Sequence, residues 1–517
     1  MVNLCKRCVI ADVLLVCISP SVGSNLTIIS ILNTLIERVK PFNTLLHLII
    51  SNLIFNHLPR NIMRHLVLTF FSIMVLTLLS LPAVALAETA PAMKTLLDQQ
   101  LATNSHRYGI VGQSVFILKN HQPLYRGQHG FANLELDVAI SNKHIFPSYS
   151  VAKLLTSVVV MQQVESGNIA LAGSIRTYLP YLPKHWQDVT VEHLLSHTSG
   201  IPRYFDMAME SRRFLANKKA IFLSLVEQPE HFKMATENRY NNTNFLLLSA
   251  ILETVTGLPY RELVTEHIIK PLGLKNTGYS SAKNIVKNMV SSYRGNQGDI
   301  RRNINIDWPE YTFAHSALYS TPEDLTSFMT ALVTGKFVSQ EALDKLWQPM
   351  KLSDGKLGRY AFGFEYGLED GYYQVGHDGG NQVKLRHYFS TEDTADNYTL
   401  AYLTNGNANG VWTDVLAESL MSIVAPKSFE MAVLKEQFIS DILTKDDIGL
   451  TKTYHAIAKA FDNDQTLIED FIRYRAYALR YGSGVASSVP AFEFISEKFP
   501  HSTRAQKNLA EIRTLLD

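Results

Sequence analysis

The chain has 517 residues, of which 46% are hydrophobic and 18% are charged, so it can bury a large core and is not a disordered chain. Lysine and arginine number 48 and aspartate and glutamate 47, and this formal net charge of +1 excludes the basic excess of a nucleic-acid-binding protein. The three cysteines, Cys5, Cys8 and Cys17, lie in the first 17 residues, which excludes disulfides and cysteine-ligated zinc from the rest of the chain.

The first 90 residues are apolar and poor in charge. Arg60 and Arg64 precede an apolar run over 66–81, and small residues follow at 83–87. A basic start, a short apolar middle and an A-x-A ending are typical of a secretory signal peptide, so we predict a signal peptide over 63–87, cleaved after Ala87. A transmembrane anchor is the alternative, although the run is shorter than the roughly 20 apolar residues that a span needs. The expected location is therefore periplasmic or secreted. Association with the membrane through the signal segment is the alternative.

Residues 1–62 do not fit a signal peptide that begins the chain. Met63 stands where a start is expected, so our hypothesis is that translation begins there and that 1–62 is a mis-assigned extension. The alternative is a hydrophobic anchor around Phe42–Leu58.

The region 88–427 mixes strand and helix patterns. Apolar and β-prone runs predict a hairpin from Ser114–Lys119 and Gln122–Arg126. Val151–Glu165 and Leu246–Val255 are predicted to be buried helices, each closed by a nearby glycine. Late strands are predicted at 383–390 and 398–404. Helices between early and late strands favour an α+β fold with one sheet built from both ends of the region.

The region 428–517 is predicted to be a C-terminal helical appendage. Glycine becomes sparse there, and four segments have amphipathic spacing, namely Glu430–Leu443, Tyr454–Phe461, Leu467–Leu479 and Ala505–Leu516.

Three segments fit the pattern Ser-x-x-Lys: Ser150–Lys153, Ser280–Lys283 and Ser353–Lys356. Only the first opens an apolar helix, where residues three apart share a face and the helix N-terminus favours a developing alkoxide. Burial would disfavour the ammonium of Lys153 and make it a better base for Ser150. The alternative is that Ser150 only caps the helix while Lys153 extends to solvent.

Two later segments carry further candidates. Tyr240 precedes the second apolar helix, and its phenol could relay a proton, while the amide of Asn242 could hold a substrate carbonyl and also bond Lys153. His377 and Gly379 lie in a glycine-rich segment, 376–380, where backbone can approach a substrate closely.

The order Ser-x-x-Lys, Tyr-x-Asn and His-x-Gly resembles that of the class C β-lactamase and penicillin-binding-protein superfamily, from about residue 95 to 425. Three further segments agree with it: Leu194–Pro202, Pro271–Leu274 and Ser320–Leu325. The resemblance implies a β-lactamase/transpeptidase-like fold, with an antiparallel sheet flanked by helices and a helical subdomain. The tail after residue 428 lies outside the match and loosely resembles tetratricopeptide-like tails.

The resemblance also implies roles for the matched residues. Ser150 would be the acylated nucleophile, Lys153 its base partner and Tyr240 the proton shuttle. The substrate-binding residues would be Asn242, His377, Gly379 and Gly380, with the N–H groups of Ser150 and Gly380 as the oxyanion hole. The implied reaction is that of an exported serine hydrolase acting through an acyl-enzyme on an ester, amide or D-amino-acid peptide.

The third motif departs from the Lys-Thr-Gly of many β-lactamases. His377 is charged only part of the time near neutral pH, and Asp378 would add a negative charge nearby, so both weaken the binding of an anionic β-lactam. A true β-lactamase or D,D-carboxypeptidase remains an alternative, and so does a non-catalytic cell-wall-binding protein on the same fold.

We expect no cofactor and no metal. His193 and His197 are four apart, but position 194 is leucine where a zinc protease needs glutamate. The expected partner is a small-molecule or peptide substrate, with cell-wall fragments as one class, and membrane contact is expected only transiently through the signal segment. The sequence leaves the oligomeric state open.

Overall fold

The structure is a computed structural model that describes residues 91–211, 214–281, 283–295, 299–303, 306–406 and 411–516. These residues belong to one compact unit, Thr89–Asp517. The predicted signal peptide over 63–87 and the predicted extension over 1–62 lie outside the described residues. In the described part of the chain, none of the helices combines the length and the apolar character needed to cross a membrane.

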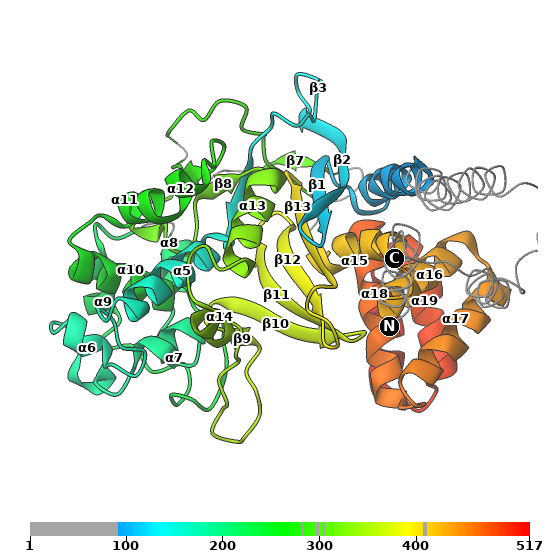
Figure 1. Cartoon of the computed structure of the whole chain (residues 1–517). Coiled ribbons are helices and arrows are strands. Elements are labelled where there is room, and N and C mark those ends of the chain that lie inside the picture. The colour runs from blue at the N-terminus through cyan, green and yellow to red at the C-terminus, as the bar shows by residue number, and fades with distance from the viewer. Residues whose placement is uncertain are drawn as a thin grey trace, which may run out of the picture. The chain divides into compact units, whose positions relative to one another are not determined.

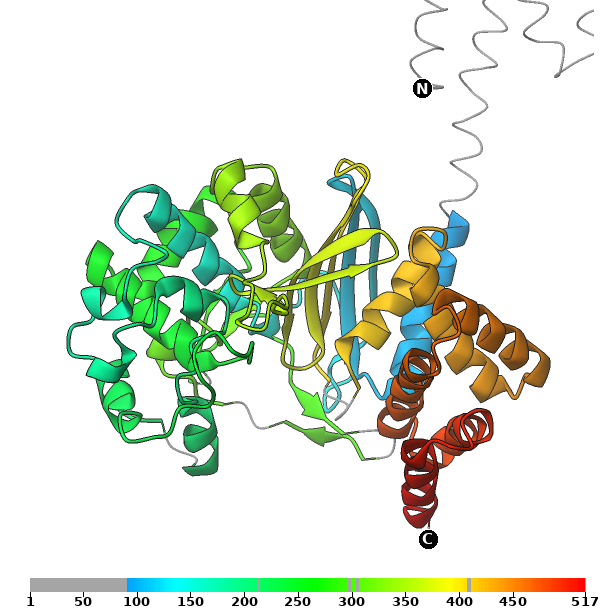
Figure 2. The same ribbon diagram turned by 90° about the horizontal axis from the view of Figure 1, so that it is seen from below.

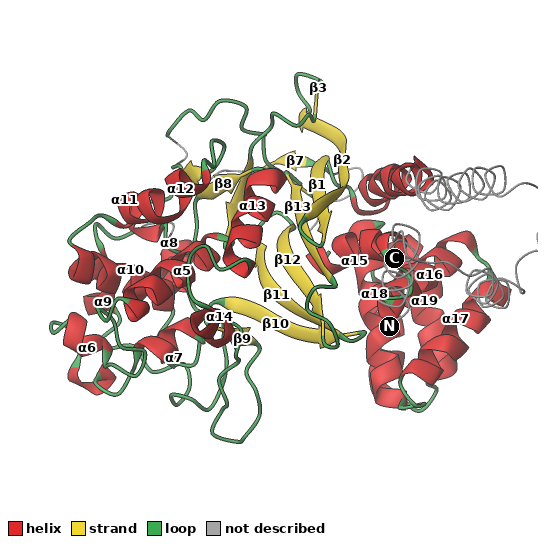
Figure 3. Cartoon of the chain, in the orientation of Figure 1, coloured by secondary structure: helices red, strands yellow, loops and turns green. Residues whose placement is uncertain are grey.

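One antiparallel sheet of eight strands forms the centre of the unit (Figures 1 and 3). Its order is β3-β2-β1-β13-β12-β11-β10-β9, so early and late strands pair directly through β1 and β13, which confirms the predicted α+β arrangement. The strands are β1 Gly112–Lys119, β2 Gln122–Asn133, β3 Val138–Ala139, β9 Tyr360–Ala361, β10 Phe364–Glu369, β11 Tyr372–Gly379, β12 Val383–Ser390 and β13 Asn397–Thr404.

Two small sheets stand beside the large one. The first joins β4 (Phe146–Tyr149), β8 (Leu318–Ser320) and β5 (Gly278–Tyr279). The second pairs β6 (Tyr293–Arg294) with β7 (Arg301–Arg302). β4 matters for the site because it ends one residue before Ser150.

Helices from the middle of the chain cover one face of the large sheet and extend into a helical subdomain (Figure 2). The catalytic candidates depend on two of them, α5 (Ala152–Glu165) and α10 (Asn242–Thr256), which pack together in one core. The others are α6 Ile175–Tyr178, α7 Val191–Leu195, α8 Tyr204–Ser211, α9 Lys218–Ser224, α11 Tyr260–Val264, α12 Lys270–Leu272, α13 Pro322–Val333 and α14 Gln340–Leu346, with short turns η1 Lys184–Trp186, η2 Thr265–Ile269 and η3 Glu310–Thr312.

The opposite face of the sheet is covered by helical residues 91–108, by α15 and by the C-terminal helices (Figure 2). Successive residues of a strand point to opposite faces, so Ala401 and Leu403 enter the first core while Leu400 and Tyr402 enter the second. Because both faces are covered, every residue of β13 is buried.

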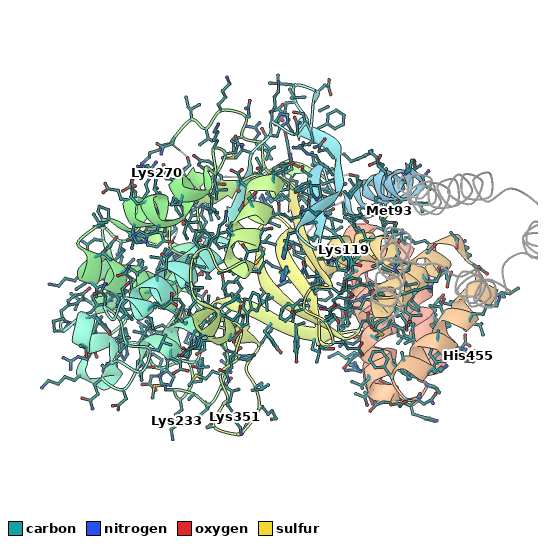
Figure 4. The ribbon with its side chains drawn as sticks, viewed as in Figure 1. Met93, Lys119, Lys233, Lys270, Lys351 and His455 are labelled. Carbon is teal, nitrogen blue, oxygen red and sulfur yellow. The ribbon has the colours of Figure 1, made fainter. Side chains whose placement is uncertain are left out.

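The C-terminal helices share this second core with the sheet. They are α15 Thr413–Val424, α16 Glu430–Thr444, α17 Asp447–Ala460, α18 Gln465–Gly482, α19 Val485–Lys498 and α20 Thr503–Thr514. Phe429 stacks on Tyr372 of β11 with ring centroids 5.1 Å apart, and Arg107 pairs with Glu436 of α16 at 2.7 Å. In Figure 4, Lys119 marks the end of β1 and His455 marks α17. The region that we predicted as an appendage is therefore packed onto the sheet.

Four of the five helices after residue 429 were predicted, and α19 was not. This helix contains Pro490 and begins with small and polar residues, and both features weaken a helical signal. Pro490 lies inside the helix, beyond the first turn, so it removes one internal hydrogen bond of α19.

Candidate active site

Ser150 lies at the junction of β4 and α5. Tyr149, just before it, has a φ of +46°, a left-handed conformation that is rare for a bulky residue and turns the chain sharply between strand and helix. The Tyr149 hydroxyl accepts a hydrogen bond from Asn381 at 3.0 Å, which holds this turn in place. Ser150 is thereby presented just ahead of the buried helix, as the sequence predicted.

Two groups converge on the Ser150 hydroxyl. The Tyr240 hydroxyl lies 2.7 Å from Ser150 Oγ, and Lys153 Nζ lies 3.3 Å from the same atom. Lys153 and Tyr240 are hydrogen-bonded to each other, and Lys153 Nζ also donates to the backbone oxygen of His315 at 3.0 Å. The structure therefore brings together the three residues predicted to be catalytic, although they lie on different segments of the chain.

Burial sets the protonation state of this cluster. Lys153 has no exposed surface, and desolvation lowers its pKa well below the usual value. Desolvation likewise raises the pKa of the Tyr240 phenol. Both shifts favour the uncharged forms, and a neutral Lys153 amine can accept the Tyr240 proton while Tyr240 accepts that of Ser150.

The two other Ser-x-x-Lys matches lie at the surface. The side chain of Lys283 is 82% exposed and pairs with Asp307, and that of Lys356 is 81% exposed and pairs with Asp354. A solvated lysine keeps its proton at neutral pH and cannot act as a base. Burial therefore distinguishes Lys153 from both.

Tyr240 and Asn242 flank the start of α10. Asn241, between them, caps the helix by accepting from the Thr243 N–H at 2.9 Å, and it donates to the Ile201 backbone oxygen at 2.6 Å. Asn242 Oδ1 is buried without a hydrogen-bond partner among the described residues. The expected bond between Asn242 and Lys153 is therefore wrong, because the carbonyl of His315 takes the amine instead.

His377, on β11, is almost completely buried beside the Tyr240 ring, with centroids 5.7 Å apart. Burial and the proximity of Lys153 lower its pKa to about 3. Its Nδ1 lies 2.5 Å from the Asp378 backbone oxygen, which can only accept, so Nδ1 carries the proton and Nε2 is an acceptor. Nε2 has no partner within the described residues. His377 thus brings no positive charge to the site.

The glycines of the third motif allow β11 to approach β4. A Cβ on Gly379 would lie 2.5 Å from the Ser148 backbone oxygen, and one on Gly380 would lie 3.1 Å from Cγ of Tyr149. Gly379 is therefore required by the contact with the segment that carries Ser150, whereas a side chain at position 380 would need only a small shift of the Tyr149 ring. This places Gly379 and Gly380 at the site, and their roles toward substrate stay predictions.

Asp378 lies in a buried network of ion pairs. Its carboxylate accepts from Lys384 at 2.8 Å and from Arg386 at 2.7 Å, both buried on β12. Lys384 also pairs with Asp414, and Arg386 with Glu365. Asp378 shares the sheet face of its strand partner Lys384, while His377 points to the other face. The Asp378 carboxylate is thus ion-paired to two buried cations that also serve Glu365 and Asp414, and its charge still acts on the His377 ring, so its effect on an anionic substrate stays a prediction.

Sequence reasoning missed two buried histidines of the site. His197 accepts at Nδ1 from the Asn241 N–H at 3.2 Å, and its ring lies 5.0 Å from that of Tyr240. His315 gives its carbonyl to Lys153. His197 stands in the 194–202 segment that supported the family resemblance, which is a signal for it, whereas no motif marks His315. His193, four residues before His197, completes the capping box of α7 with Thr190.

Comparisons with known proteins agree with this geometry. The family profile described as Beta-lactamase matches residues 93–418. Penicillin-binding protein 4* of Bacillus subtilis is 24% identical over 256 residues, which cover 47% of this chain and 56% of that protein. The matched part of this chain spans less than two thirds of the length of this relative and of two other curated relatives.

Solved structures show the same fold. A D-stereospecific amidohydrolase from Streptomyces sp. superposes with a TM-score of 0.53 at 22% identity, covering 64% of this chain and 97% of that one. The octameric penicillin-binding protein homologue from Pyrococcus abyssi gives a TM-score of 0.56 at 21% identity, covering 68% of this chain and 81% of that one.

Proposed function

Because the chain belongs to the beta-lactamase family, we propose that it is an exported serine hydrolase that forms an acyl-enzyme on Ser150 with an ester, an amide or a D-amino-acid peptide. The observation that carries the proposal is the hydrogen-bonded set of Ser150, Lys153 and Tyr240 around a buried amine. Export is proposed from the basic, apolar and A-x-A pattern over 63–87.

The proposed acylation moves one proton through this set. Ser150 Oγ attacks the substrate carbonyl carbon while its proton passes to Tyr240 and the Tyr240 proton passes to Lys153, which becomes an ammonium. The proton returns through Tyr240 to the leaving alkoxide or amine as the ester or amide bond breaks. Water then attacks the acyl-enzyme, and the same relay accepts and returns its proton.

The neutral third motif favours uncharged carbonyl substrates over penicillins. A carboxylate beside His377 would meet an uncharged ring with a bare acceptor nitrogen, which offers it neither charge nor a hydrogen bond. The fold is also that of a D-stereospecific amidohydrolase, which supports an amide as one substrate class.

Labelling with a fluorophosphonate probe tests the proposal. We expect one adduct on Ser150 by mass spectrometry, no adduct with Ser150→Ala, and full labelling of Ser353→Ala, the matched variant in the exposed Ser-x-x-Lys. Absence of an adduct on the wild type would favour a non-catalytic binding protein. A panel of a p-nitrophenyl ester, D-phenylalanine amide, D-Ala-D-Ala and a penicillin then ranks the substrates, and a preference for penicillin would overturn our reading of His377.

A further inference from the structure

We propose that His315 and Tyr204 are positioning residues that hold the amine of Lys153 against Ser150 and Tyr240. The inference rests on the proposed function, because it concerns the base of that reaction. Neither residue lies in the three motifs that the sequence revealed.

The backbone oxygen of His315 decides how the Lys153 amine is oriented. It lies 3.0 Å from Nζ and can only accept, so it fixes one N–H of the amine. The other contacts of Nζ are with Ser150 Oγ, at 3.3 Å, and with the Tyr240 hydroxyl, toward which a neutral amine held in this way would direct its lone pair. An amine that turned away from this carbonyl would direct its lone pair elsewhere and break the proton path.

The imidazole of His315 holds that carbonyl in place. The ring is completely buried, with Nε2 2.6 Å from the Tyr204 hydroxyl and Nδ1 2.8 Å from Ser316 Oγ. Both ring nitrogens are occupied within the protein, so the ring has no atom left for a substrate. His315 therefore acts through Lys153 and is a positioning residue.

Tyr204 connects the 314–315 segment to helix α10, which begins just after Tyr240. Its backbone N–H donates to Thr243 Oγ1 at 3.0 Å, on the first turn of α10. Thr156, one turn after Lys153 on α5, donates to the Ala314 backbone oxygen at 2.7 Å. Two successive carbonyls of the 314–315 segment thus receive bonds from α5, and the Tyr204–His315 bond ties that segment to α10.

The position of the 314–315 segment matters because it keeps the Lys153 amine buried. The Glu365 carboxylate raises the pKa of the Lys153 amine, but burial lowers this pKa by more. A looser His315 loop would admit water and bring the pKa of Lys153 back toward its usual value, which would weaken the base. The titratable groups facing the amine are Tyr240, Glu365 and three histidines whose pKa values burial and Lys153 lower: His197, His315 and His377.

The test compares Tyr204→Phe with Tyr402→Phe. Tyr402 is a matched control, because its hydroxyl is also buried and hydrogen-bonded, but it bonds Gln113 in the second core, on the other face of the sheet. The first readout is the titration of Lys153 Nζ by NMR of ¹⁵N-lysine-labelled protein, with Lys153→Met to assign the signal. The second is the pH profile of kcat/KM for a p-nitrophenyl ester.

We expect Tyr204→Phe to raise the pKa of Lys153, to move the acid limb of kcat/KM in the same direction, and to lower kcat about 10-fold with KM unchanged, while Tyr402→Phe does none of these. His315→Gln, which keeps a hydrogen-bonding side chain, should lose less activity than His315→Ala. If Tyr204→Phe does not fold, Ser316→Ala removes the other ring bond and tests the same point.

The inference would be overturned if Lys153 had the same pKa in Tyr204→Phe as in the wild type, or if both tyrosine variants shifted this pKa equally. An inactive wild type would instead refute the proposed function, and the NMR titration would still test the positioning role.

Discussion

Replacing Lys153 with methionine tests the protonation state on which the site depends. The variant keeps a side chain of similar length but removes the amine, whose pKa burial lowers well below 10.5. Between the lowered pKa and 10.5 the unfolded chain therefore binds one more proton than the folded chain, so the free energy of unfolding rises with pH. A difference of one bound proton corresponds to about 1.4 kcal/mol per pH unit. Over this pH range the free energy of unfolding of the wild type should therefore rise, relative to that of Lys153→Met, by about this amount for each pH unit.

Urea unfolding followed by fluorescence of the four tryptophans measures this difference at several alkaline pH values. The same variant should lose about 10²- to 10⁴-fold in kcat for a p-nitrophenyl ester, the range of general-base catalysis. Lys218→Met is the control, because Lys218 is also largely buried with a lowered pKa but pairs with Glu253 away from Ser150, and it should stay active. A pH-independent difference between wild type and Lys153→Met would mean that Lys153 stays charged in the folded state, and the neutral-amine mechanism would be wrong.

Two further variants test charges around the third motif and the tail. His377→Lys should lower KM for a carboxylate-bearing ester relative to its methyl ester by about 10-fold, since it supplies the missing cation, and equal KM changes for both esters would contradict this. Lys435→Met should cost about 3 kcal/mol of unfolding free energy in urea, because the buried Lys435 bridges Glu369 and Glu418, both at 2.9 Å, and Lys435→Arg should recover most of it. An unchanged midpoint in Lys435→Met would show that this bridge does not stabilise the packing of α16.

The parts of the site that local sequence determines were predictable. Ser150 and Lys153 are three residues apart at the start of an apolar helix, so spacing and hydrophobicity alone put both at one helix end. Gly379 and Gly380 stood out as glycines, and for Gly379 the structure gives the reason in the close approach of β11 to β4. The fold followed because strands at both ends of the region enclose a run of helices.

Long-range contacts were beyond such reasoning. His315 contributes a backbone oxygen, which every residue type has, so its sequence position carries no signal for its role. The ion pairs of Asp378 were missed for a related reason, because no local sequence pattern connects Asp378 with its cations. Alternation along β11 puts the Asp378 side chain on the face opposite His377, and the buried Lys384 and Arg386 that pair with it come from the next strand.

The neutrality of His377 and the basicity of Lys153 depend on each other. In the proposed acylation an ammonium forms on Lys153 while negative charge forms on the substrate oxygen, and in a buried site each charge is costly unless a partner is near. Lys153 already helps to lower the pKa of His377, and a permanent cation at position 377 would lower the pKa of Lys153 in the same way. Such a cation would disfavour the Lys153 ammonium and slow the proton transfer. His377→Lys should therefore improve the binding of anionic esters and at the same time lower kcat, whereas a purely substrate-binding role for His377 would leave kcat unchanged.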